Sequence, residues 1–259
     1  MNILRAILAA FIQQWKTTGA GSINLSFFFM AVPNVAVIAW IALRSDNPQV
    51  LTYLLVGAPL AFIWNGVILR VGWSLSTELF GRTLEFTLIS RTPMILALFG
   101  KALAHIAYGL PVGVVALITM FIVTRQLPQV ASFPLLIVSL FLVIVGLAII
   151  SLLLAPSVVL AGGRGGFFNV IMALGVLVSG FMFPIDQLPT WLEVIARLLP
   201  TSWAMYGVWQ SIIGPESLWP VLGAWGACLL TSAALLAVTY WTFKVVERRI
   251  RVTGILSTY

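Results

Sequence analysis

Residues 133–160 read FPLLIVSLFLVIVGLAIISLLLAPSVVL and lie inside a window, 126–163, that contains no Asp, Glu, Lys or Arg. A helix needs about 20 consecutive apolar residues to cross the hydrocarbon core of a bilayer. This stretch exceeds that length, so it predicts a transmembrane helix. Five more charge-free windows are long enough to cross in the same way, and they lie at 17–43, 47–69, 102–124, 165–185 and 217–243.

The composition of the whole chain agrees with this prediction. Of its 259 residues, 61% are hydrophobic and 8% are charged, whereas soluble domains carry about 25% charged residues. This balance excludes a soluble globular protein, a disordered chain and a nucleic-acid-binding domain. We expect an all-α membrane protein with six transmembrane helices, near 23–43, 50–72, 96–124, 133–160, 166–184 and 218–243.

The placement of the basic residues predicts the orientation. Cytoplasmic loops of membrane proteins carry an excess of Lys and Arg. Six spans with both termini in the cytoplasm put eleven of the 14 basic residues inside and leave Arg44, Arg125 and Arg197 outside. A seventh crossing at 198–215 would move the four basic residues of the C-terminus outside, and that segment is interrupted by Pro and Gly. We therefore expect a single multi-pass domain, 1–259, in a bacterial cytoplasmic (inner) membrane, with a cytoplasmic tail at 244–259.

The N-terminal segment has a different apolar pattern. Leu4, Leu8, Phe11 and Trp15 recur at helical spacing, and polar or charged residues lie between them. This pattern predicts an amphipathic helix, 1–18, on the cytoplasmic membrane surface. The alternative is a simple extension of the first span.

The loop at 74–93, SLSTELFGRTLEFTLISRTP, joins the second and third spans. Ser76 or Thr77 can cap a helix start, and Pro93 would end the helix. Glu78 and Arg82 stand at i,i+4 in the favourable order. The segment predicts a short cytoplasmic helix, which either joins two spans or docks a cytoplasmic partner.

The segment 184–216 breaks the transmembrane pattern a second time. Thr190 and Glu193 form a capping-box sequence after Pro189, and Glu193 can pair with Arg197. Pro200 would end that helix, and Thr201 or Ser202 can cap the next one. The segment predicts an extracellular re-entrant hairpin, which is either part of an aromatic belt or a gate.

These two segments carry a family resemblance. The sequence ELFGRTLE at 78–85, followed by SRTP at 90–93, resembles the coupling-helix motif of type-2 ABC exporter permeases. The sequences SGFMFP at 179–184, LPTW at 188–191 and LLPT at 198–201 resemble the hairpin of the same family. The whole plan is also similar, with a surface helix, six spans, a hairpin before the sixth span and a basic C-terminus.

The resemblance implies a permease subunit that works as a homodimer in membrane lipid, each copy docked on a separate ABC ATPase. ATP and magnesium would bind to that ATPase, because none of the three lysines here completes a P-loop. The chain itself would hold no cofactor and no catalytic or metal site. The resemblance also implies ATPase docking through Glu78, Arg82 and Glu85. It further implies a gate hairpin that includes Pro184, Pro189, Trp191 and Pro200.

Four polar residues stand inside or beside the predicted spans. We expect Lys101 to extend its ammonium to the cytoplasmic interface. His105 predicts either a neutral, hydrogen-bonded packing role or a proton relay. Asn65 and Asn169 predict either a substrate path or hydrogen bonds between helices.

Three function classes compete at this stage. The preferred one is an ABC exporter permease for a lipophilic compound, such as a drug, a lipid or a hydrophobic peptide. A permease for a polysaccharide or lipid-linked glycan is the alternative within the same family. A proton-coupled transporter would need acidic residues within the spans, and an intramembrane enzyme would need a nucleophile with its base or a metal cluster. The sequence shows neither arrangement.

Overall fold

A computed structural model describes residues 3–18, 25–44, 48–81, 94–160 and 166–253. These residues form helices, turns and short irregular segments, and they contain no strand, so the predicted all-α class is confirmed. The elements are α1 (Ile3–Thr18), α2 (Leu25–Leu43), α3 (Pro48–Phe80), α5 (Met94–Thr124), α6 (Phe133–Leu160), α7 (Gly166–Val178), η1 (Ile185–Gln187), α8 (Thr190–Arg197), α9 (Pro200–Ile213) and α10 (Leu218–Thr253).

Four helices in the described part of the chain are long and apolar enough to cross a membrane. The qualifying stretches are Gln49–Ile68, Ile95–Thr124, Phe133–Ala155 and Leu218–Val245. Helix α7 has only 13 residues, and at 1.5 Å per residue it extends about 20 Å, well short of a hydrocarbon core of about 30 Å. The layout of six crossings therefore stays a prediction.

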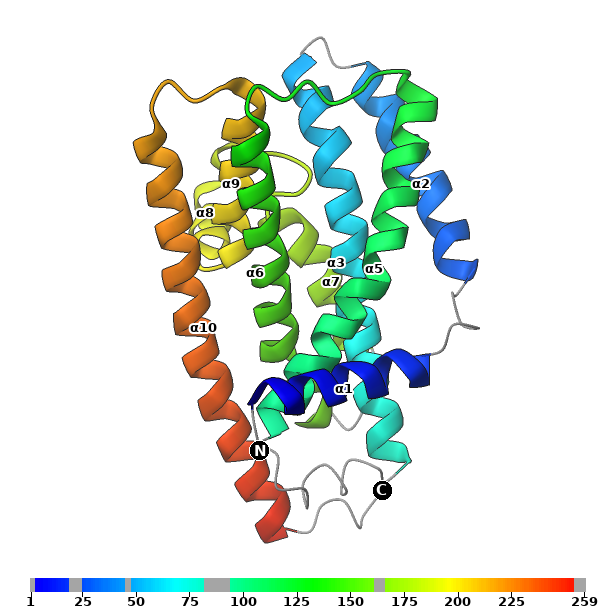
Figure 1. Cartoon of the computed structure of the whole chain (residues 1–259), viewed down its shortest axis with the longest axis vertical. Helices are drawn as coiled ribbons and strands as arrows, with labels where there is room; N and C mark the ends of the chain where they lie inside the picture. The colour runs from blue at the N-terminus through cyan, green and yellow to red at the C-terminus, as the bar shows by residue number, and fades with distance from the viewer. Residues whose placement is uncertain (1–2, 19–24, 45–47, 82–93, 161–165, 254–259) are drawn as a thin grey trace.

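The long helices stand side by side, and α1 lies across one end of them (Figure 1). The last turns of α10 lie at that same end, whereas the connections from α5 to α6 and from α9 to α10 lie at the opposite end. Helices α8 and α9 occupy the half of the bundle farther from α1. We refer to the end that α1 crosses as the base of the bundle.

Helix α3 forms the centre of the core. Within its apolar stretch 83% of the residues are buried, against 22% in α10. The largest fully buried side chains include Tyr53 and Trp64 of α3, together with Phe181 from the segment after α7. Helix α10 therefore presents most of its apolar surface outward, as a lipid-facing helix does, while α3 is enclosed by its neighbours.

The structure corrects the predicted start of the loop helix. Helix α3 runs without interruption to Phe80, and the Gly81 amide still donates to the Thr77 carbonyl oxygen at 2.8 Å. Ser76 and Thr77 are therefore inside a long helix and do not cap a new one. The physical reason is that no Pro or Gly stands between Trp73 and Phe80 to end the helix. Residues 82–93 lie outside the described residues.

Candidate functional site

Helix α1 packs closely on the first turns of α5 at the base. Ala6, Ala10 and Gln14 face the bundle and are buried, whereas Leu4, Leu8 and Trp15 are exposed. At Gly100 of α5 the helices approach so closely that an added Cβ would collide with the Ile7 carbonyl oxygen. The small residues let the two backbones meet, and they leave a row of large apolar side chains on the outer face of α1.

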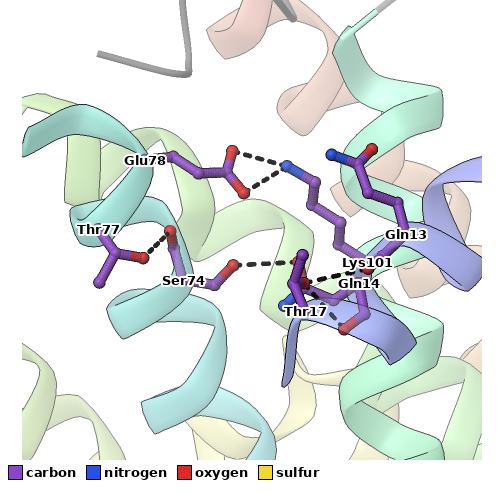
Figure 2. Close-up of polar contacts among 7 residues, drawn as sticks. All are labelled: Gln13, Gln14, Thr17, Ser74, Thr77, Glu78 and Lys101. Carbon is purple, nitrogen blue, oxygen red and sulfur yellow. Dashed lines mark hydrogen bonds and ion pairs between the residues drawn. The ribbon is translucent and has the colours of Figure 1, made fainter. Parts of the chain in front are cut away.

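The start of α5 is joined to the end of α3 by a largely buried ion pair (Figure 2). The Lys101 Nζ lies 2.6 Å from both carboxylate oxygens of Glu78, and the two side chains are 7% and 19% exposed. Glu78 stands on the extension of α3 beyond the membrane-spanning stretch, so the Lys101 ammonium meets a carboxylate there. That the ammonium reaches the cytoplasmic interface stays a prediction.

Hydrogen bonds attach α1 to this junction (Figure 2). Ser74 of α3 donates to the Gln14 Oε1 at 3.2 Å, one turn before Glu78. Farther along α1, Trp15 stacks on Tyr108 with ring centroids 4.2 Å apart, and the Tyr108 hydroxyl donates to the Trp15 carbonyl oxygen at 2.5 Å. Helices α1, α3 and α5 thus form one connected polar unit, which we call the base junction.

His105 lies one turn beyond Lys101 on α5. Its side chain is 2% exposed, and neither ring nitrogen has a hydrogen-bond partner within the described part of the chain. Ser74, Lys101, His105 and Ser151 line a cavity of about 10 Å³, about enough for a single water. The side chain is buried and packed as predicted, but the described residues supply no hydrogen bond for it, so the expected hydrogen-bonded role is not met there. No described carboxylate contacts His105, and a relay role stays a prediction.

Of the three predicted docking residues, the structure describes one. Glu78 is engaged in the base junction, so its carboxylate already has a structural role. Arg82 and Glu85 lie outside the described residues. Docking through these three residues therefore stays a prediction.

The second region is the break that follows α7, residues 179–184. The Tyr53 hydroxyl of α3 donates to the Gly180 carbonyl oxygen, and Gly180 has a positive φ of 75°. One turn along α3, an added Cβ at Gly57 would collide with the Phe181 carbonyl oxygen. Trp64 packs against Phe181 with centroids 5.9 Å apart. Helix α3 thus holds the backbone of the break directly.

The helices after the break begin at prolines. Pro184 precedes η1, Pro189 precedes α8 and Pro200 is the first residue of α9. The predicted capping box is wrong, because Thr190 is already helical and no side chain caps α8. Glu193 pairs instead with Arg197, as the spacing predicted.

Ser202 also has a different role from the predicted cap. Its hydroxyl donates back to the carbonyl oxygens of Ala196 and Leu199, which links α9 to the end of α8. Trp191 is 67% exposed, whereas Pro200 is buried. The gate role of these residues stays a prediction.

The predicted path residues are not brought together by any described contact. Asn65 is half-buried on α3 beside Trp64, and Asn169 lies in α7, where its side chain is outside the described set. Their role in a substrate path stays a prediction.

Residues 3–213 match the family model described as ABC-2 type transporter. The chain belongs to the ABC-2 type transporter family. The resemblance identified from residues 78–93 and 179–201 is thereby confirmed.

One relative of this ABC-2 type transporter chain is the linearmycin resistance permease protein LnrN of Bacillus subtilis (strain 168). It is 29% identical over 143 residues, and the match covers 55% of this chain and 31% of the relative. The chain therefore aligns with about a third of that protein.

Sequence reasoning missed two features of this ABC-2 chain. The pairing of Glu78 with Lys101 joins residues 23 positions apart, and the bond from Tyr53 to Gly180 joins residues 127 positions apart. Neither pair follows a helical spacing. The available signal for the first was a lone lysine near a predicted span, beside a loop that contains acids.

Proposed function

We propose that this chain is the membrane-spanning permease subunit of an ABC exporter that moves a lipophilic compound outward. The observation that carries the proposal is the match to the ABC-2 family over residues 3–213, a range that includes α1, the base junction and the hairpin. The family implies a separate ATPase partner. The relative is named for resistance to a compound, which favours small-molecule export over glycan export.

The base junction supports a way of transmitting movement. Helix α3 continues beyond its apolar stretch as one rigid helix to Phe80, directly before residues 82–93. The ion pair to Lys101 and the bond to Gln14 link this extension to α5 and α1. A displacement of residues 82–93 by an ATPase would therefore move three helices together, as a rigid-body change. Two copies of the chain would enclose the substrate path. Both termini would lie on the cytoplasmic side of a bacterial inner membrane.

Co-purification tests the partner. The tagged chain is co-expressed with a candidate ABC ATPase from the same genome, and the mass of the complex is measured in detergent. We expect two permease chains with two ATPases, and we expect Glu85→Lys to lower the recovered ATPase about tenfold, because it reverses a charge in the predicted docking segment.

Glu216→Lys is the matched control, since it makes the same change in the connection between α9 and α10 and should leave the complex intact. A chain that purifies without ATPase under every nucleotide condition would contradict the exporter proposal. Equal losses with Glu85→Lys and Glu216→Lys would contradict the docking assignment.

Reconstitution tests the substrate. The complex is placed in liposomes together with a fluorescent lipophilic compound or a lipid-linked oligosaccharide, and ATP is added. We expect ATP-dependent transport of the lipophilic compound. Transport of the oligosaccharide alone would favour the glycan alternative.

A further inference from the structure

A cavity lies between the hairpin and the first turns of α10. Its volume is about 290 Å³, near the lower end of the range for small-molecule sites, about 300–1,000 Å³. Residues of η1, α8, α9 and α10 line it, among them Asp186, Trp203, Tyr206 and Gly223. No role proposed above uses this cavity.

Two aromatic rings form one wall. Trp203 and Tyr206 stand three residues apart on α9, so both project from one face of the helix, and both are half-buried. The Trp203 Nε1 donates to the Arg197 carbonyl oxygen at 2.8 Å, which fixes the indole ring. The faces of such rings attract organic cations.

The charges around the cavity do not balance. Arg197 lines the cavity, and its guanidinium lies over the Trp203 ring, 5.9 Å from the centroid. The Arg197 Nε also lies 2.9 Å from the Glu193 Oε1, so its positive charge is compensated within α8. Asp186 is exposed and forms no ion pair with any residue that the structure describes. Its carboxylate therefore borders the cavity without a compensating cation, next to Tyr206.

The wall opposite the rings suits a hydrocarbon. Pro220, Gly223 and Ala224 of α10 contribute it, and a Cβ added at Gly223 would meet no atom within 4 Å. We propose that this cavity binds an amphiphilic organic cation, with its ammonium group at Asp186 and Tyr206 and its alkyl chain along α10. The inference rests on the proposed function, and it specifies that the lipophilic compound carries a positive charge.

Binding to the purified chain in lipid nanodiscs tests the site. The probe is tritiated decyltrimethylammonium, and decanesulfonate carries the same alkyl chain with the opposite charge. Empty nanodiscs give the background from lipid. We expect saturable binding of the cation and no saturable binding of the anion.

Substitutions then locate the site. We expect Asp186→Asn to weaken binding of the cation about tenfold, because it removes the attracting charge. Glu216→Gln, which neutralises an exposed acid outside the cavity, should leave the affinity unchanged. Gly223→Phe should abolish binding by filling the cavity, whereas Gly226→Phe, which also meets open space but does not line the cavity, should bind as the unmodified chain does.

Three results would overturn the site. They are binding of decanesulfonate at equal or higher affinity, full affinity in Asp186→Asn, and equal effects of Gly223→Phe and Gly226→Phe. The assay needs no ATPase, so a failure here leaves the exporter proposal to its own test. A failure of co-purification likewise leaves the binding result intact.

Discussion

Lys101→Met is expected to lower the free energy of unfolding by about 3 kcal/mol, because it removes the ammonium that compensates the largely buried Glu78 carboxylate. Lys101 is 7% exposed on its side chain and Glu78 is 19% exposed, so water compensates little of the loss. For a chain of this size the apparent melting temperature should fall by roughly 5–10 °C. The measurement is a fluorescence-detected unfolding series in detergent.

Two controls separate burial from charge in this experiment. The double variant Glu78→Gln with Lys101→Met removes both charges and should recover most of the lost stability. Arg197→Met breaks an ion pair whose arginine is 51% exposed, and it should cost less than about 1 kcal/mol. If Lys101→Met is no worse than Arg197→Met, the base junction does not stabilise the bundle.

The same double variant separates two roles of Glu78. If its carboxylate serves only the base junction, the stable double variant should bind the ATPase normally. If the carboxylate contacts the ATPase as well, the double variant should lose the partner while keeping its melting temperature.

Gly57→Ala is the second substitution with a large expected effect. The added Cβ would occupy the position of the Phe181 carbonyl oxygen, and that atom belongs to the backbone of the break held by Tyr53. Residues 179–184 would have to move away from α3. We expect a loss of about 2–3 kcal/mol, the size of an overpacked core substitution. The checks are the melting temperature and the yield of monodisperse protein.

Gly66→Ala is the matched control on the same helix. A Cβ there would meet no atom within 4 Å, and alanine favours a helix over glycine by up to about 1 kcal/mol. Gly66→Ala should therefore be neutral or slightly stabilising. Equal losses at both positions would show that the contact with Phe181 does not hold the break.

Several elements could be predicted because their signals are local. The charge-free stretch at 133–160 coincides with α6, and the prolines at 184, 189 and 200 fall where η1, α8 and α9 begin. The apolar spacing of residues 4–15 placed Leu4 and Leu8 on the outer face of α1, whereas Trp15 stacks on Tyr108 of α5. The family could be recognised because its two motifs are short and continuous.

Other features differ from the local prediction because a second interaction competes with the local signal. The capping-box pattern at Thr190 was outweighed by Pro189, which precedes the helix without any side-chain cap. The loop helix expected at Ser76 merged into α3, because no Pro or Gly stands between Ser76 and Phe80 to end the helix. Lys101 pairs with a carboxylate 23 residues away in the sequence, a contact that no local spacing indicates.

The sequence by itself was enough to indicate a helical membrane protein and to identify its family. Each of the signals involved, namely the length of the apolar runs, the placement of charges and the spacing of prolines, acts within a few residues. Only the tertiary structure decided which polar groups meet. Glu78 pairs with Lys101, Tyr53 donates to the Gly180 carbonyl oxygen, and Asp186 lines cavities that aromatic rings of α3 and α9 also line. These contacts depend on how helices distant in the chain pack side by side. The role of the glycines at the closest approaches likewise depends on which backbone packs against them.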